Sequence, residues 1–230
     1  TEAEVSGALL CLDVTEKVID EAVSLGCNLV VSHHPLLFHG LKQIAGQNDV
    51  QRTVMKAIKQ DVCVVSMHTN MDNALNGVNF KIAEHLGLSN VRFLSSKCID
   101  GVECGSAVIG ELSQPMAAQD FILYVKQQLQ AKSAACNELL SRPVRRVAIC
   151  GGAGDFLLGE AILGGADAFI TGEMHYHQYF GHEQQVQICV VGHYESEHFT
   201  TEIFRDVIQQ ACPDVRCCIA STNTNPIIYL

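Results

Sequence analysis

Short apolar runs alternate with longer amphipathic stretches along the whole chain. The apolar runs have the length of buried strands, and the stretches between them carry apolar residues at helical spacing. We predict strands over Ala8–Leu12, Leu29–Ser32, Val62–Met67, Ala107–Ile109, Val147–Cys150, Ala168–Thr171, Gln187–Val191 and Arg216–Ala220. We predict helices over Glu16–Leu25, Asp49–Lys59, Val78–Leu86, Ala117–Leu129, Phe156–Leu163 and Ser196–Ala211. Strands that alternate with helices in this way are typical of an α/β fold with substantially parallel sheets.

The two halves of the chain carry related patterns. The first contains A-L-L-C-L-D, a helix and then G-C-N-L-V-V-S-H-H, whereas the second contains V-A-I-C-G-G, a helix and then G-A-D-A-F-I-T-G-E. The corresponding positions include Gly26 and Gly165, Asn28 and Asp167, Ser32 and Thr171, His34 and Glu173, His68 and His193, and Asp72 and Glu197. We therefore predict two α/β halves, residues 1–100 and 101–230, related by an internal repeat. The least regular stretch, Ser89–Gly105, is the predicted boundary.

Composition narrows the range of partners. The 230 residues include 15 Lys and Arg against 25 Asp and Glu, a net charge of −10. A protein with this charge binds DNA, RNA or anionic lipid poorly, although a small anionic substrate at a metal stays compatible. The chain has no apolar run long enough for a membrane span. With 48% hydrophobic residues, it can bury a sizeable core.

The 11 cysteines do not resemble a disulfide framework. Their number is odd, and no C-x-x-C pair occurs. Several lie inside apolar runs, where a free cysteine behaves as a small apolar residue. We therefore expect a reducing cytoplasm as the compartment. The first residue is Thr1 and not Met, so we expect that an initial segment of the natural chain is missing from this sequence.

Clusters of histidine and acidic residues follow four of the predicted strands. They are His33 with His34, His68 with Asp72, Glu173 with His175 and His177, and His193 with Glu197. Imidazole and carboxylate are the ligands that zinc, iron and manganese prefer. In open α/β sheets, ligands gather just outside the carboxyl ends of strands. Two such halves face to face would form one composite metal site at their interface.

Each cluster also has a simpler interpretation. Asp72 would serve equally as a turn residue or helix cap, and Glu173 as the cap of the helix that follows it. His193 and Glu197 could be a local pair one helical turn apart. The turn Cys150–Asp155 (C-G-G-A-G-D) would either cradle a phosphate or simply join a strand tightly to a helix. No serine lies in a G-x-S-x-G elbow, so nothing suggests a serine triad.

Five motifs together resemble the Nif-three-like family, also called the GTP cyclohydrolase 1 type 2 homologue family. They are S-H-H-P-L-L-F (Ser32–Phe38), H-T-N-M-D-N-A (His68–Ala74) with G-V-N (Gly77–Asn79), C-G-G-A-G (Cys150–Gly154), G-A-D-A-F-I-T-G-E-M-H-Y-H (Gly165–His177) and G-H-Y-E-S-E (Gly192–Glu197). They occur in the family's order and span nearly the whole chain. The family usually carries W-D-N-x-G before the strand at Ala8, and this sequence lacks that motif.

The resemblance implies two similar α/β domains with a dinuclear metal site at their interface. The implied cofactors are two divalent ions per subunit, zinc, iron or manganese. The implied ligands are His33, His34, Asp72, His193 and Glu197, with Glu197 bridging the two ions. His68, Glu173 and His177 match motif positions near that site, and we assign Glu173 and His177 as the candidate catalytic residues that move protons. The family also tends to form toroidal hexamers, so we expect a homo-oligomer.

Two functions follow from this site. The first is a metal-dependent hydrolase acting on a small molecule, whether nucleotide-like, a phosphoester or a cyclic amide. The second is a non-catalytic metal-binding regulator or interaction protein. Five protein ligands shared between two metals leave coordination positions open for water, as catalytic sites do, and this favours the hydrolase.

Overall fold

The computed structural model describes residues 4–230 and groups them into two compact units. The first unit contains the residues up to Met71 together with Thr200–Ile228. The second contains Asp72–Phe199 together with Tyr229–Leu230. Each unit has its own sheet and core, so each is described by itself.

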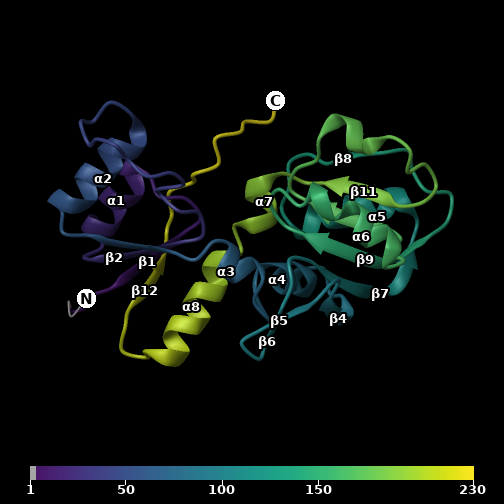
Figure 1. Cartoon of the computed structure of the whole chain (residues 1–230), viewed down its shortest axis with the longest axis horizontal. Helices are drawn as coiled ribbons and strands as arrows, with labels where there is room; N and C mark the ends of the chain where they lie inside the picture. Colours follow the sequence, from purple (N-terminus) through teal and green to yellow (C-terminus); the bar gives the residue numbers. More distant parts are fainter. Residues whose placement is uncertain (1–3) are drawn as a thin grey trace. The chain divides into compact units, whose positions relative to one another are not determined.

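The first unit is built on a four-stranded parallel sheet in the order β12-β1-β2-β3. Figure 1 labels β1, β2 and β12 of this sheet. Its strands are β1 (Ala8–Cys11), β2 (Leu29–Ser32), β3 (Cys63–Ser66) and β12 (Cys217–Ile219). Its helices are α1 (Glu16–Ser24), α2 (Asp49–Lys59), the short α3 (Thr69–Asp72), whose last residue begins the second unit, and α8 (Thr200–Ala211). The final strand of the chain therefore pairs with the first.

Alternation along β1 explains why helices cover both faces of this sheet. Leu9 and Cys11 point into a core shared with Val18 and Ile19 of α1. Ala8 and Leu10 point the other way, into a core shared with Phe204 of α8. The two central strands, β1 and β2, are buried on both faces, and they therefore read as continuous apolar runs and not as alternating patterns.

The helices of the first unit begin at caps that the sequence supplies. The Thr15 hydroxyl accepts a hydrogen bond from the Val18 amide at 3.3 Å, and Asn48 Oδ1 accepts one from the Gln51 amide at 2.9 Å. Such caps satisfy amide groups that the first turn of a helix leaves without partners. They fix the starts of α1 and α2 at the expected residues.

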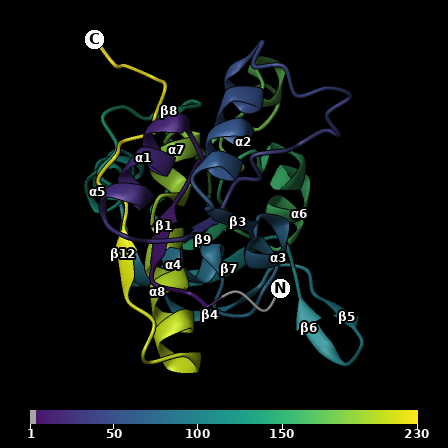
Figure 2. The same ribbon diagram turned by 90° about the vertical axis from the view of Figure 1, so that its left-hand side faces the viewer.

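The second unit is built on a mixed six-stranded sheet in the order β4-β7-β9-β10-β11-β8. Its strands are β4 (Ser89–Phe93), β7 (Val108–Met116), β8 (Ala135–Cys136), β9 (Val144–Cys150), β10 (Ala168–Thr171) and β11 (Gln187–Val190). The central three, β9, β10 and β11, are parallel, whereas β7, β4 and β8 pair antiparallel with their neighbours. A separate hairpin joins β5 (Lys97–Ile99) to β6 (Val102–Cys104) (Figure 2).

The helices of the second unit are α4 (Val78–His85), α5 (Ala118–Gln128), α6 (Leu158–Leu163) and α7 (His193–Glu197), with short 3₁₀ helices η1 (Asp155–Leu157) and η2 (Tyr176–Tyr179). Two of them, α5 and α6, lie between its strands in sequence, whereas α4 precedes β4 and α7 follows β11. Leu158 and Ala161 of α6 pack with Ala148, Phe169 and Ile188 on one face of the sheet. The core therefore lies directly beneath the strands that end at the candidate site.

The structure confirms the α/β class and corrects three details of the prediction. Only the first sheet is wholly parallel. The stretch Ser89–Gly105 is not irregular, because it contains β4, β5 and β6. The predicted helix Ser196–Ala211 is two helices, since α7 ends at Glu197 and α8 begins at Thr200.

The compact units also group the chain differently from the predicted halves, residues 1–100 and 101–230, because α8 and β12 from the end of the chain complete the first unit. The boundary near residue 100 stays a prediction of how the chain divides into domains. Within the described residues 4–230, no helix combines the length and apolar character that crossing a bilayer requires.

Candidate metal centre

Three histidines of the first unit gather at the carboxyl ends of β2 and β3. His33 and His34 directly follow β2, and the His68 amide donates to the carbonyl of His33 at 2.9 Å. The ring centroids lie 4.9 Å apart for His33 and His34, 5.7 Å for His33 and His68, and 5.8 Å for His34 and His68. His33 is fully buried. Pairing of the parallel strands β2 and β3 thus brings the imidazole of His68 next to that of His33, which lies 35 positions earlier in the sequence.

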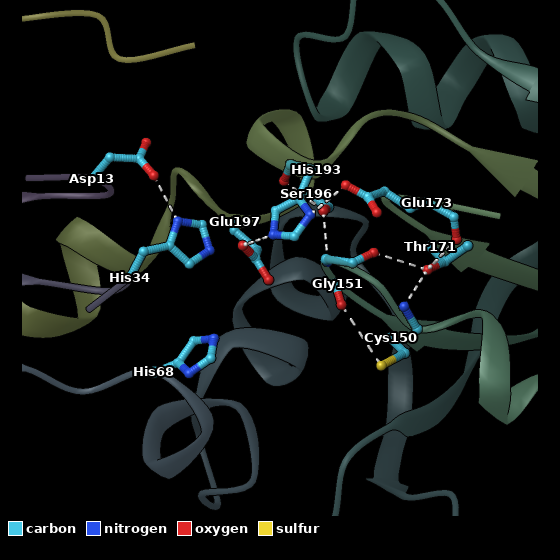
Figure 3. Close-up of polar contacts among 12 residues, drawn as sticks. Asp13, His34, His68, Cys150, Gly151, Thr171, Glu173, His193, Ser196 and Glu197 are labelled. Carbon is cyan, nitrogen blue, oxygen red and sulfur yellow. Dashed lines mark hydrogen bonds and ion pairs between the residues drawn. The ribbon is translucent and has the colours of Figure 1, made fainter. Parts of the chain in front are cut away.

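Asp13 orients one of these rings. Its Oδ1 lies 2.7 Å from His34 Nδ1 (Figure 3). Its Oδ2 accepts a hydrogen bond of 2.6 Å from the Thr224 hydroxyl. A carboxylate at Nδ1 fixes the proton there and leaves Nε2 as the atom that can bind a metal. The sequence prediction missed Asp13. It follows β1 by two positions, so the signal that identified the histidines, a polar residue just after a strand, also applies to it.

In the second unit, His193 lies between two carboxylates. It is the first residue of α7, just past the end of β11. His193 Nε2 is 3.0 Å from Glu197 Oε2, and His193 Nδ1 is 2.7 Å from Glu173 Oε1 (Figure 3). The hydrogen bond to Glu197 raises the pKa of His193 to about 9, against its partial burial, and Glu173 adds to the rise. Without a metal, this imidazole is therefore protonated at neutral pH.

A glycine turn after β9 makes room for this group. Gly152 has a φ of +62°, and a Cβ at this position would overlap Glu197 Oε1 and lie 3.3 Å from His193 Nε2. The Gly152 amide donates to the Ser196 hydroxyl at 2.9 Å, and that hydroxyl donates to the His193 carbonyl at 2.9 Å. The C-G-G-A-G-D turn therefore allows the backbone to approach α7 closely, a role that only glycine fills without strain.

The charge of Asp72 affects the pKa of Cys150, the last residue of β9 in the second unit. Burial raises the pKa of the Cys150 thiol to about 12, and the negative charges of Asp72, Glu197 and Asp155 raise it further in that order. Asp72 and Glu197 thus both lie close enough to one buried thiol to affect its ionisation. Because Asp72 ends α3, it does not begin a helix, and Gly77 occupies the N-cap position of α4. The helix-cap interpretation of Asp72 is therefore wrong.

The cluster Glu173, His175 and His177 separates in the structure. Glu173 contacts His193, whereas His175 forms an ion pair with Asp155 through its Nδ1. The hydrogen bond to Asp155 raises the pKa of His175. The ring of His177 lies in η2 against Tyr176 and Phe180. Since His175 is the N-cap of η2, Glu173 is not a helix cap. The catalytic roles of Glu173 and His177 stay predictions.

The donor chemistry of both units fits a divalent metal. The first unit offers imidazoles, His33 and His34, with His68 beside them. The second offers Asp72, His193 and Glu197. The charges of Asp72 and Glu197 add to the effect of burial on Cys150, and the raised pKa keeps this thiol neutral and therefore a poor ligand. Zinc, iron and manganese accept such imidazole and carboxylate sets.

Comparisons with known proteins agree with this arrangement of motifs. A family model described as Duf34/NIF3 (NGG1p interacting factor 3) matches residues 1–226. A GTP cyclohydrolase 1 type 2 homolog of Clostridium perfringens is 32% identical over 197 residues, 85% of this chain and 75% of that protein. Another protein of the same name from Lactococcus lactis is 29% identical over 227 residues, 97% of this chain and 85% of its own.

Solved structures match the fold across the chain. A hypothetical protein of Staphylococcus aureus has a TM-score of 0.90 at 25% identity, covering 100% of this chain and 89% of its own. A Bacillus cereus protein related to NIF3 has a TM-score of 0.86 at 25% identity, covering 98% and 90%. The family model, the curated relatives and the fold all point to one assignment. The chain belongs to the Duf34/NIF3 (NGG1p interacting factor 3) family.

Proposed function

We propose that the protein is a metal-dependent hydrolase whose two units together hold two divalent metal ions. The proposed ligands are His33 and His34 from the first unit with Asp72, His193 and Glu197 from the second. The observation that carries the proposal is the position of His193, which lies between Glu173 and Glu197 at 2.7 and 3.0 Å. In the proposed site, Glu197 binds the same metal as the Nε2 atom of His193, and Glu173 orients the ring through the Nδ1 atom.

The imidazoles of the first unit support the same proposal. A metal needs ligands on rigid backbone, and His33 and His34 continue the ladder of β2, with their amides bonded to the carbonyls of Cys11 and Leu12 at 3.2 and 2.9 Å. Asp13 orients the His34 ring in the same way as Glu173 orients His193. Both units thus present an imidazole whose outer nitrogen bonds a carboxylate, a recurrent feature of metal sites.

An internal repeat is part of this proposal. In each unit a strand, a helix and a second strand lead to a third parallel strand, β1-α1-β2-β3 and β9-α6-β10-β11. Gly26 after α1 and Gly165 after α6 have φ values of +67° and +72°. Pairs of this kind support the correspondence of His68 with His193 and of Asp72 with Glu197. A repeat would supply ligands of both halves from equivalent strand ends.

The proposed chemistry is hydrolysis of a small molecule. Two divalent ions, when bound, lower the pKa of water and stabilise negative charge on the substrate. The carboxylate of Glu173, which is partly exposed, is placed to accept a proton near His193. His177 is the second proton-transfer candidate by its motif position. The substrate is nucleotide-like, a phosphoester or a cyclic amide, the first because curated relatives carry the name GTP cyclohydrolase 1 type 2 homolog. A homohexamer is the proposed assembly.

The test begins with elemental analysis of protein purified without added metal. The metal found is then used in a turnover screen across nucleotides, phosphoesters and cyclic amides. The key variant is Glu197→Ala, with Glu84→Ala on the exposed surface of α4 as the matched control. We expect Glu197→Ala to lose more than half of the bound metal and nearly all turnover, and Glu84→Ala to keep both. Metal without turnover in the parent protein would instead support the non-catalytic regulator, and full activity in Glu197→Ala would rule out the proposed site.

A further inference from the structure

Two cysteines lie directly opposite each other at the edge of the second sheet. Cys136 of β8 is the register partner of Cys189 of β11, and the two strands are antiparallel. Opposed residues in antiparallel strands have Cα atoms about 4.5–5.5 Å apart and side chains on the same face. This spacing falls within the range of about 4.4–6.8 Å that a disulfide requires.

The side chain of Asn137 fixes this register. Its Nδ2 donates to the Val186 carbonyl at 2.9 Å, and its Oδ1 accepts a hydrogen bond from the Ile188 amide at 2.9 Å. Asn137 Oδ1 also accepts a bond of 2.9 Å from Gln187 Nε2. Because Asn137 is adjacent to Cys136, these bonds hold the short β8 strand in place although it has only two residues. The two thiols are therefore held face to face by polar contacts and not by β8 alone.

The two thiols differ in access to solvent. Cys136 is exposed on the edge strand, whereas Cys189 is fully buried. Ile188 and Val190, the neighbours of Cys189, pack into the core on the α6 face, so Cys189 points to the opposite face of the sheet. A reagent in solution can therefore contact the thiol of Cys136, whereas Cys189 has no exposed surface.

We propose that Cys136 and Cys189 form a reversible disulfide by exchange with a low-molecular-weight disulfide such as oxidised glutathione. The thiolate of Cys136 attacks one glutathione sulfur, breaks the S–S bond and releases one glutathione thiolate. The thiolate of Cys189 then attacks the Cys136 sulfur of the mixed disulfide and releases the second glutathione. Two protein thiols are oxidised, one glutathione disulfide is reduced to two thiols, and the two protons leave with them.

The exchange has a predictable pH dependence. The part of Cys136 that is shielded from solvent raises the pKa of its thiol. The pKa of the fully buried Cys189 is raised to about 12, with the charge of Cys136 adding to the rise. The thiolate is the attacking form, so the reaction is slow at neutral pH and accelerates as the pH rises. The bond would join β8 to β11, the strand that leads through Gly192 to His193. Oxidation would thus link β8 covalently to β11, four residues before the proposed metal ligand His193.

The hairpin of the same unit supplies a contrasting pair. Cys98 and Cys104 lie on the neighbouring strands β5 and β6, but Cys98 is opposite Glu103 and Cys104 is opposite Lys97. One register step puts their side chains on opposite faces. Proximity along two paired strands is therefore present in both cases, and only the register differs.

The experiment uses the full-length reduced protein, incubated with oxidised glutathione at mildly alkaline pH and digested after glutamate without reductant. Cleavage gives Leu112–Glu138 and Gln184–Glu195, whose only cysteines are Cys136 and Cys189. We expect mass spectrometry to find these peptides joined, and no bond between Cys98 and Cys104. Glutathione adducts on Cys136 with Cys189 still reduced, at every time point, would overturn the proposal.

Two variants separate the steps. In Cys189→Ala, Cys136 should accumulate as a stable glutathione adduct, because the second thiol is gone. In Cys136→Ser, Cys189 should stay reduced for as long as the protein is folded. Cys212→Ser removes another exposed cysteine and should leave the joined peptides unchanged. Modification of Cys189 in folded Cys136→Ser would show that Cys136 is not the route to it, and would count against the proposal.

Discussion

The turn after β1 in the first unit and the turn after β9 in the second unit differ in one important residue. In the first unit, Asp13 follows β1 by two positions and bonds His34. In the second, Gly152 follows β9 by two positions and lies against Glu197 and His193. In the proposed repeat, which aligns Cys11 with Cys150, these residues correspond. One unit adds a carboxylate at this point, and the other leaves the space of a side chain.

This difference follows from where each unit obtains its carboxylates. The first unit presents imidazoles, so a carboxylate from the turn is free to orient one of them. The second unit has Glu173 and Glu197 on later elements, and both already contact His193. A further side chain from the turn would occupy the place of Glu197. The end of a strand can therefore supply a charged side chain, as Asp13 does, or leave space for one from another element, as Gly152 does for Glu197.

The largest expected effect comes from filling that space. We predict that Gly152→Ala destabilises the protein by about 3 kcal/mol, because the new Cβ overlaps Glu197 and the residue must keep a left-handed conformation. Urea unfolding measures the loss. The matched control is Gly181→Ala, where φ is +79° but nothing lies within 4 Å of the Cβ. That variant should lose only about 1 kcal/mol, the cost of the conformation alone. Equal losses in both variants would show that the contact with Glu197 does not matter.

A second pair of corresponding positions, Asp167 and Asn28, allows a carboxyl group to be removed from one unit and added to the other. Asp167 is partly buried, which raises its pKa, but the amides of Arg146 and Arg145 and the guanidinium of Arg142 outweigh burial and lower it. A lowered pKa means stability that is full above the unfolded value and is lost as pH falls through the folded value. We predict that Asp167→Asn costs about 2 kcal/mol at neutral pH and that the difference from the parent protein vanishes in acid.

The corresponding residue in the first unit, Asn28, allows the converse substitution, whose penalty should also fall in acid. Its amide donates to the Glu4 carbonyl at 2.8 Å, and its oxygen accepts from the Ser6 amide at 2.9 Å. Asn28→Asp removes the donor and adds a charge beside a carbonyl, so its penalty should shrink when acid protonates the new carboxyl group. Unfolding free energies measured from neutral to acidic pH test both variants. A constant penalty for Asp167→Asn across that range would contradict the assignment.

The smallest expected effect concerns the orientation of His34. Asp13→Asn keeps the size of the side chain but removes the charge that holds the Nδ1 proton. We predict a loss of metal affinity of roughly tenfold, as for other residues that orient a ligand from behind. Competition with a chelator measures it, and nitrogen NMR of His34 reports the tautomer without metal. Asp20→Asn, an exposed carboxylate paired with Lys56, is the control and should change neither readout.

Strand ends were the most predictable part of the molecule. β2 and β10 have the predicted residues, and α2 has the predicted start and end, because their apolar pattern and caps act locally. The histidines and acids that follow strands were found for the same reason. The meeting of Glu173 with His193 was not predictable from spacing, since it depends on β10 and β11 being neighbours in the sheet.

The missed features have no buried apolar run of their own or depend on side-chain packing. β8 has two residues and only the register with β11 makes it a strand. The strands β5 and β6 are mostly exposed, so no buried run marks them. The break between α7 and α8 has neither Gly nor Pro, and it falls at Phe199, a buried residue whose ring contacts His198 and His85. Side-chain packing, and not local propensity, ends α7 there.

The pairing of β12 with β1 has a consequence for the order in which the protein is made. A ribosome releases β1 early, but its partner β12 emerges only after the continuous stretch Asp72–Phe199 that makes up most of the second unit. The same holds for Ser221 and Thr222, which bond Glu21 of α1. During synthesis, the first unit therefore has one edge of β1 without its strand partner. An unpaired strand edge promotes aggregation, and chaperones commonly bind such exposed segments. The imidazole site of the first unit is the last to have all of its supporting residues.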